Sequence, residues 1–446
     1  MKKVWEIICI YPFYNGNNKS ISIFSLIRIL EEENNLVCHT EEVKQNIQYD
    51  YKRNDPAFVV GIEIEGCLLN DKGLPMDAST LIDLSINTKY PLDYEYGKCQ
   101  FEFKTEPLFF YELSKLNDII HEFIERLDNL IGKAYPNENV IPVFLGANPS
   151  PSIFSDEMII TNKPRYKKIS EWQSGFHNAQ MDGQLFKPNL IGTAIQGFHF
   201  HLQGKNADYT AHMFNHILNL IPSSILLGAN SRLVAGRIYS IYEPRIFLFD
   251  QAEGQNSGFP AIAKYLDTLQ EYVDYVSSRK PILATNYYEL EKERHDDVRI
   301  RIGDDSYRVE TRILSVQPTP QELICMIEFF IGYLHHTISE QRPLRPLADI
   351  REERMSVIRS GFNAQGVFDF KESVRLELDF AKKGLFDLNI NPEFLNILYR
   401  RVENKTSPGE VVVNLWDKKF NGSLENTSVE IISDIWEHTK TNKSIT

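Results

Sequence analysis

Four short segments of the chain carry ionisable residues at alternate positions, with apolar residues between them. The segments span residues 59–69, 99–105, 196–202 and 307–316. Because side chains alternate between the two faces of a strand, each segment predicts a strand with one apolar and one ionic face. The ionic faces carry Glu63 and Glu65, Glu102 and Lys104, His199 and His201, and Glu310 and Arg312.

The apolar faces are explained by an ordinary sheet, but the ionic faces need a further reason. A single Glu-x-Glu pair on a half-buried strand is usually a solvated face, and a single His-x-His pair is as often a surface pair as a ligand pair. Four such strands are harder to dismiss, because neighbouring carboxylates repel unless cations or arginines lie among them. The set therefore favours a shared site for metal ions and phosphate.

Composition excludes several classes of protein. The chain has 446 residues, 42% of them hydrophobic, and a formal net charge of −13. The acidic balance and the lack of a long Lys/Arg cluster argue against a nucleic-acid partner. Five scattered cysteines without a CxxC spacing fit a reduced, cytoplasmic chain. No run of 18 apolar residues occurs, so we expect no membrane partner. We also expect small-molecule substrates, and a homodimer is left open.

The segments between these strands have helical spacing. Apolar residues recur at helical intervals over residues 111–131, 207–221, 261–276 and 321–338, the second ending at Pro222. Strands with a single apolar side, separated by long helices, favour an α+β fold: a largely antiparallel sheet with helices on one face and an open polar face. The expected regions are an appended strand–helix–strand segment (1–55, closed by a polar break at 45–56), a catalytic domain (56–361), and a helical C-terminal extension packed on it (362–446).

The motifs, once placed in order, resemble those of the glutamate–cysteine ligase type 2 (carboxylate–amine ligase) family. Gly-Ile-Glu-Ile-Glu at 61–65 is followed by Gln-Phe-Glu-Phe-Lys-Thr-Glu-Pro at 100–107, Gly-Phe-His-Phe-His at 197–201 and Val-Glu-Thr-Arg at 309–312. Further segments that resemble the family's pattern are Gly-Ala-Asn-Pro at 146–149, Arg-Tyr at 165–166, Ala-Asn-Ser-Arg at 229–232 with the later Arg245, and an arginine-rich segment at 352–361. The resemblance covers about residues 58–361.

Some positions depart from the family pattern. Asn148 stands where the family has a histidine, Ser360 stands where it has an aromatic residue, and Leu-Gln-Gly follows the histidine motif. These departures put glutamate and cysteine in doubt as substrates and leave the ligase chemistry intact. We interpret them as changed substrate contacts beside retained metal ligands.

The resemblance implies a glutamine-synthetase-like fold in which ATP phosphorylates a carboxylate and an amine then displaces phosphate, forming an amide. Carboxylate ligands suit Mg²⁺ or Mn²⁺, and one imidazole among them is compatible with Mn²⁺. By resemblance, two or three ions would be held by Glu63, Glu65, Glu95, Glu102, His199 and Glu310. Within that set, Glu102 and Glu95 would join Glu65, and His199 and Glu310 would complete a site with Glu63.

The resemblance also assigns the basic residues. Arg312 would contact the γ-phosphate, with Lys104 and His201 also at the nucleotide. Arg245 would clamp a carboxylate or phosphate, with a structural ion pair equally open. Arg237 and Arg354 are expected at the surface.

Two other function classes stay open. A metal-dependent hydrolase would use the same acids and histidines without ATP, although no HExxH or HxxEH helix is present. A non-catalytic nucleotide-binding relative would keep the fold, although an uncompensated acid cluster is costly to bury. Release of ADP or phosphate on mixing with ATP and candidate acids separates the three.

Overall fold

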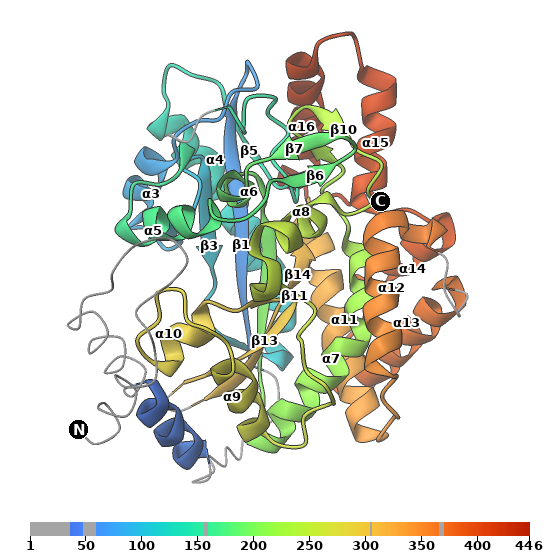
Figure 1. Cartoon of the computed structure of the whole chain (residues 1–446). Coiled ribbons are helices and arrows are strands. Elements are labelled where there is room, and N and C mark those ends of the chain that lie inside the picture. Colours follow the sequence, from blue (N-terminus) through green and yellow to red (C-terminus); the bar gives the residue numbers. More distant parts are fainter. Residues whose placement is uncertain (1–35, 48–58, 156–158, 304–305, 365–369) are drawn as a thin grey trace, which may run out of the picture.

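The computed structural model describes residues 36–47, 59–155, 159–303, 306–364 and 370–446 (Figure 1). Of the predicted strand–helix–strand segment at 1–55, only residues 36–47 are described, and they form a helix. Its Lys44 forms an ion pair with Asp274, and its Val43 and Ile47 are buried. The polar break predicted at 45–56 is therefore wrong for residues 45–47, and the strand and helix predicted before residue 36 lie outside the described part.

An eight-stranded antiparallel sheet forms the centre of the molecule. Strand β1 lies in its middle, between β8 on one side and β3 on the other, while β4 and β5 pair with the two ends of β1. This arrangement confirms the predicted α+β fold with a largely antiparallel sheet. The sheet strands are β1 (Val59–Asn70), β2 (Leu92–Tyr94), β3 (Gln100–Lys104), β4 (Leu108–Phe109), β5 (Val140–Val143), β8 (Gly197–Gln203), β13 (Val298–Ile302) and β14 (Tyr307–Ser315).

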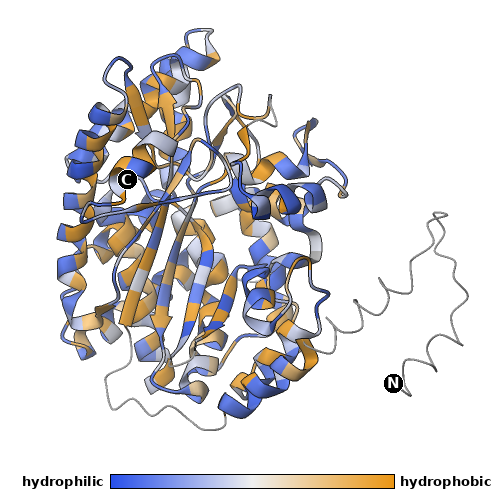
Figure 2. Cartoon of the chain, turned by 90° about the vertical axis from the view of Figure 1, so that its left-hand side faces the viewer, coloured by the Kyte–Doolittle hydropathy of each residue, from blue (hydrophilic) through white to orange (hydrophobic). Residues whose placement is uncertain are grey.

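The apolar face of the sheet is covered by α4 (Leu113–Ala134), α7 (Ala207–Gly228) and α11 (Pro320–Ser339). Phe103 of β3 stacks on Phe123 of α4 with ring centroids 3.9 Å apart, and Phe200 of β8 meets Phe330 of α11 edge-on at 4.6 Å. Figure 2 shows the alternation of hydrophobic and hydrophilic residues along the strands that makes this one-sided packing favourable.

Among the C-terminal helices, α13 and α14 lie beside α11, while α15 and α16 lie together near the top of the view in Figure 1. Helices α13 and α14 pack against α11, and α16 packs against α4 and β5. The described residues of the expected C-terminal extension (362–446) are mostly helical. The helices are α12 (Leu347–Ser360), α13 (Phe370–Asp387), α14 (Leu395–Asn404), α15 (Pro408–Lys419) and α16 (Leu424–Lys440).

The remaining elements are shorter. These are α3 (Ser79–Ser85), α5 (Pro164–Gln173), α6 (Pro188–Ala194), α8 (Pro244–Glu253), α9 (Leu269–Ser277), α10 (Tyr287–Lys292), the hairpins β6 (Ala179–Met181) with β7 (Gln184–Phe186) and β9 (Leu233–Val234) with β10 (Arg237–Ile238), and the parallel pair β11 (Ser257–Gly258) with β12 (His295–Asp296).

Two of the predicted helices differ from the structure. The helix expected to end at Pro222 continues to Gly228, because almost every residue of α7 is buried and tertiary packing outweighs the hydrogen bond that the proline removes. The helix expected at 261–276 begins only at Leu269, where the Thr268 side chain accepts from the Glu271 backbone N–H. The helices predicted at 111–131 and 321–338 are confirmed within three residues at each end.

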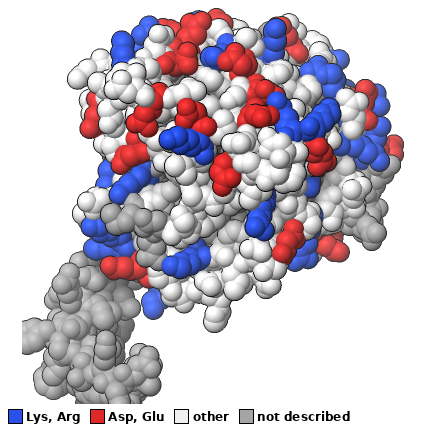
Figure 3. Space-filling model, turned by 90° about the horizontal axis from the view of Figure 1, so that it is seen from above, with Lys and Arg blue, Asp and Glu red and all other residues white. Residues whose placement is uncertain are grey.

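On the face seen from above, acidic and basic side chains are interspersed (Figure 3). Such mixing is typical of a solvated protein surface. Within the described ranges, no helix combines the length and the apolar character that crossing a membrane requires.

Candidate active site

The register of the sheet brings the predicted ionic residues together. In β1 and β8, Glu63 is directly opposite His199, and in β1 and β3, Glu65 is opposite Glu102. Glu310 of β14 is opposite His201 of β8. Directly opposed residues of an antiparallel pair lie on the same face, so three strand pairings assemble one polar surface.

This surface forms the floor of a cavity of about 430 Å³. Every site residue predicted from the sequence lines this cavity, including Glu95, which directly follows β2. The predicted residues at the cavity are Glu63, Glu65, Glu95, Glu102, Lys104, His199, His201, Arg245, Glu310 and Arg312.

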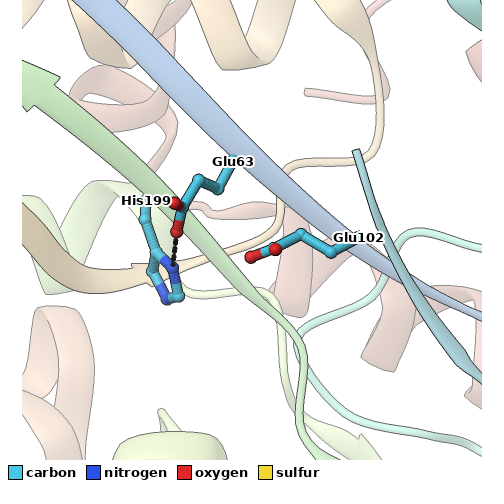
Figure 4. A group of neighbouring side chains, drawn as sticks. All are labelled: Glu63, Glu102 and His199. Carbon is cyan, nitrogen blue, oxygen red and sulfur yellow. Dashed lines mark hydrogen bonds and ion pairs between the residues drawn. The ribbon is translucent and has the colours of Figure 1, made fainter. Parts of the chain in front are cut away.

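Three overlapping groups of side chains are close enough to share a metal ion. In each, the candidate ligand atoms lie within 4.8 Å of one another. Glu63 and Glu102 converge with His199 (Figure 4), where the imidazole Nδ1 lies 3.1 Å from a Glu63 oxygen. The other groups are Glu65 with Glu95 and Glu102, and Glu63 with His201 and Glu310.

The grouping differs in one respect from what the resemblance implies. Glu65, Glu95 and Glu102 form one group, as expected. His199 and Glu310 were expected together, but they fall into two groups that share Glu63. His201, expected at the nucleotide, lies beside Glu63 in the group that contains Glu310.

The electrostatics of the acid cluster suit a divalent cation. Burial, reinforced by repulsion from Glu95 and Glu63, raises the pKa of Glu102 to about 10. Burial and the neighbouring Glu65 raise the pKa of Glu95 to about 8. Burial and the nearby Arg312 lower the pKa of His199, which favours the neutral imidazole that binds metal. Buried oxygens that repel one another, beside a neutral imidazole, are a donor set that fits Mg²⁺ or Mn²⁺.

Lys104 lies at the edge of the acid cluster. Its ammonium lies 2.5 Å from an oxygen of Glu102 and 3.0 Å from one of Asp93, and the side chain is 45% exposed. The lysine therefore balances part of the negative charge of the cluster in this structure.

Arginines of β13 and β14 line the cavity beside Glu310. Arg312 donates a hydrogen bond to Glu310 at 2.6 Å, and Arg299 of β13 donates two hydrogen bonds of 2.8 Å to the same carboxylate. Such a paired carboxylate keeps guanidinium groups in fixed positions. Arg308 donates to His201 at 3.3 Å.

Sequence analysis missed Arg299, Arg301 and Arg308, although all three line the cavity. A signal was present in each case. Arg299 and Arg301 alternate with valine and isoleucine over residues 298–302, and Arg308 precedes Glu310 by two positions. Strand periodicity therefore places them on the ionic face.

Arg245 projects into the cavity from the first turn of α8. Its guanidinium donates to the backbone carbonyls of Ile313 and Arg312, at 3.3 and 3.2 Å. Among the described residues it forms no salt bridge, which leaves the expected structural ion pair without support.

The weaker assignments have mixed outcomes. Arg237 is exposed, as expected, but the surface position expected for Arg354 is wrong: it is 2% exposed and paired with Asp297 and Asp250. Asn148 is fully buried, donating to the Cys67 thiol at 3.4 Å, and Ser360 is exposed at the end of α12. Neither lines the cavity, so neither informs on substrate choice.

Comparisons with known proteins point in one direction. The model of glutamate–cysteine ligase family 2 matches residues 59–369. A search of curated proteins gave no match.

Two solved structures share the fold. A bifunctional glutathione synthetase from Pasteurella multocida aligns with a TM-score of 0.57 at 13% identity, over 91% of this chain and 54% of that one. The chain thus spans about half the length of that enzyme. A glutamate–cysteine ligase from Francisella tularensis aligns with a TM-score of 0.57 at 13% identity, over 88% of this chain and 90% of that one.

Proposed function

This chain belongs to glutamate–cysteine ligase family 2, and we propose that it joins a carboxylic acid to an amine in an ATP-dependent reaction that passes through an acyl phosphate. Family membership supports a ligase that forms carbon–nitrogen bonds. The structure of the Francisella tularensis ligase, which contains AMP, supports use of an adenine nucleotide. The products would be an amide, ADP and phosphate.

The observation that carries the proposal is the set of three overlapping groups of candidate ligands on one sheet face, in a cavity that several arginines also line. Glu63, Glu65, Glu95, Glu102, His199 and Glu310 would hold two or three Mg²⁺ or Mn²⁺ ions, and His201 would join them. When bound, such ions neutralise phosphate oxygens and stabilise the charge of the transferred group. A hydrolase would need no comparable array of arginines.

The basic residues have distinct roles in this proposal. Arg312, fixed by Glu310, would contact the γ-phosphate and stabilise its charge during transfer. Arg299 would hold Glu310 in place through its paired hydrogen bonds. Arg245, anchored on two carbonyls, would orient the substrate carboxylate, and Lys104 would approach the nucleotide from the exposed rim.

The substrates are proposed to be amino-acid-like, because the cavity offers charged and polar contacts over most of its lining. The test is to mix the protein with ATP, Mg²⁺ and pairs of amino acids, and to follow ADP and phosphate release with mass spectrometry of the product. ADP release that depends on both an acid and an amine supports the ligase. Hydrolysis of a substrate without ATP would support the metal-dependent hydrolase instead.

A further inference from the structure

A second cavity, of about 280 Å³, lies beside the site and is lined by α5, α10 and the segment before α10. Five residues line both this cavity and the carboxylate-lined cavity: Arg165, Ile169, Glu253, Lys292 and His295. The two spaces therefore meet at these side chains. A substrate lying in the second cavity would present one end to the reaction centre at this junction.

His295 is held at the junction by a buried acid. Its Nδ1 lies 3.3 Å from a carboxylate oxygen of Glu253, which is only 1% exposed. The other oxygen of Glu253 accepts a hydrogen bond of 2.5 Å from Gln173, whose side-chain oxygen in turn accepts from the Tyr96 hydroxyl at 3.1 Å. The carboxylate is thus fixed from two sides.

This arrangement determines which ring nitrogen of His295 can accept a proton. A carboxylate only accepts hydrogen bonds, so Nδ1, the ring nitrogen that faces the Glu253 carboxylate, is the donor in this contact. In the neutral ring Nε2 then carries the lone pair. The side chain is 25% exposed and its ring packs near Phe249, so the ring is oriented yet accessible.

The proposed reaction requires a base at such a place. An amine substrate is mostly protonated near neutral pH and attacks an acyl phosphate only after losing a proton. We propose that His295, oriented by Glu253, is the general base that deprotonates the amine substrate, which occupies the second cavity. This inference rests on the proposed ligase function.

The ammonium proton moves to Nε2 of His295, and the freed nitrogen lone pair attacks the acyl carbon. The carbon–nitrogen bond forms, the bond from that carbon to the phosphate oxygen breaks, and phosphate leaves with the electron pair. The second amine proton and the proton held by His295 are returned to solvent.

The charges around the second cavity indicate the class of amine. Arg165 and Lys168 of α5 and Lys292 of α10 provide cations, while Glu253, Glu289 and Glu293 provide acids. Three cations on the walls suit a carboxylate on the amine-bearing molecule. The expected acceptor is therefore an amino acid or a short peptide rather than ammonia or a simple alkylamine.

Hydroxylamine separates deprotonation from acyl-phosphate formation. It is largely unprotonated at neutral pH and converts acyl phosphates to hydroxamates without a base. In His295→Gln we expect turnover with the amino-acid acceptor to fall about a hundredfold, the scale of general-base catalysis. Hydroxamate formation should stay close to wild type. In Glu253→Gln the rate of amide formation should fall about tenfold, because Glu253 acts only through His295.

The pH profile and a rescue experiment distinguish the loss of a general base from a structural effect of the His295 substitution. In wild type, turnover with the amino acid should fall at acid pH as the base becomes protonated, and this limb should be lost in His295→Gln. If that variant folds poorly, His295→Ala assayed with added imidazole should regain amide formation. His438→Gln, an exposed histidine of α16, is the control and should match wild type in both assays.

The outcomes distinguish the two levels of the proposal. Equal loss of amide and hydroxamate in His295→Gln, or no loss of either, would overturn the role of His295 while the ligase function stands. Failure of the wild-type protein to form any hydroxamate with ATP and acids would overturn the ligase function and this inference with it.

Discussion

At the scale of single residues, the alternation of ionic and apolar side chains predicted the ionic face of the sheet from the sequence. Glu63 and His199 come from segments 136 residues apart, yet strand register places them 3.1 Å apart. What the sequence could not predict is how the candidate ligands group, since that depends on side-chain rotamers. Glu253 and His295 were missed because neither belongs to an alternating strand: Glu253 ends α8 and His295 begins the two-residue strand β12, and only the fold brings them together.

The acid cluster leads to a prediction in which activity and stability move apart. Glu63→Gln and Glu102→Gln should each abolish turnover, because loss of a ligand disturbs the placement of phosphate. In chelator, Glu102→Gln should have a thermal midpoint no lower than wild type, because burial and repulsion already disfavour its charged form. Turnover assays measure the loss of activity, and calorimetry measures the thermal midpoint.

The control is Glu106→Gln, which changes an exposed glutamate just beyond the strand that carries Glu102. Full activity of the wild-type protein in excess chelator would contradict the metal sites.

Arg312 offers a second test at this scale. Lysine provides one point charge where arginine provides a planar fork, so Arg312→Lys should not replace it. We expect turnover to fall about a hundredfold with ATP affinity little changed, as for a group that acts mainly in the transition state. Arg237→Lys, on an exposed arginine, should behave as wild type. Near-normal turnover in Arg312→Lys would place Arg312 outside the reaction.

At the scale of elements, the strands were predictable and the helix ends were less so. The strands follow a strict alternation that packing enforces, because a slip by one residue would turn the carboxylates into the core. The end of α7 was misjudged because Pro222 is a local signal, whereas burial of the whole helix is a property of the fold. The start of α9 was visible in the sequence, since Thr268 and Glu271 have the spacing of a capping box.

The contact between α11 and α13 supplies a prediction at this scale. A Cβ on Gly332 would collide with the backbone oxygen of Ala381, and a Cβ on Gly384 would collide with the oxygen of Gly332. Gly332→Ala should therefore lower the free energy of unfolding by about 3 kcal/mol, because the helices must move apart. Urea unfolding measures the change.

A matched control lies in α4. Gly132 is a helical glycine with nothing within 4 Å of an added Cβ. Gly132→Ala should raise stability by about 0.5–1 kcal/mol, since alanine loses less backbone entropy on folding. The same sign of change in both variants would contradict the close helix contact.

At the scale of the whole molecule, the C-terminal helices are tied to the sheet domain by a buried ion pair. Arg401 of α14 and Glu322 of α11 are both fully buried and lie 2.9 Å apart. Arg401 also donates to the carbonyl of Leu227 at the end of α7 and to Gln317. The helical character of the C-terminal extension was predictable from the sequence. The ion pair between Arg401 and Glu322 was not, because a charged residue in a helix is normally expected to face solvent. We propose that residues 362–446 serve as an integral support of the catalytic domain.

Breaking this pair tests that support. Arg401→Ala should cost about 3–5 kcal/mol of stability, because Glu322 would be left buried without its cation. Arg400→Ala, at the exposed neighbouring position, should change stability by less than about 0.5 kcal/mol. Denaturant unfolding of the two variants gives the comparison, and equal effects would show that the buried pair does not secure the C-terminal helices.

A heavy oxygen isotope can show whether the carboxylate is activated as an acyl phosphate. The acid substrate is labelled in its carboxylate and incubated with ATP, Mg²⁺ and the amine. Phosphorylation makes one carboxylate oxygen the bridge to phosphorus, so the account predicts one labelled oxygen in each phosphate released, with ADP as the other product. Label recovered in AMP, with pyrophosphate released, would contradict it.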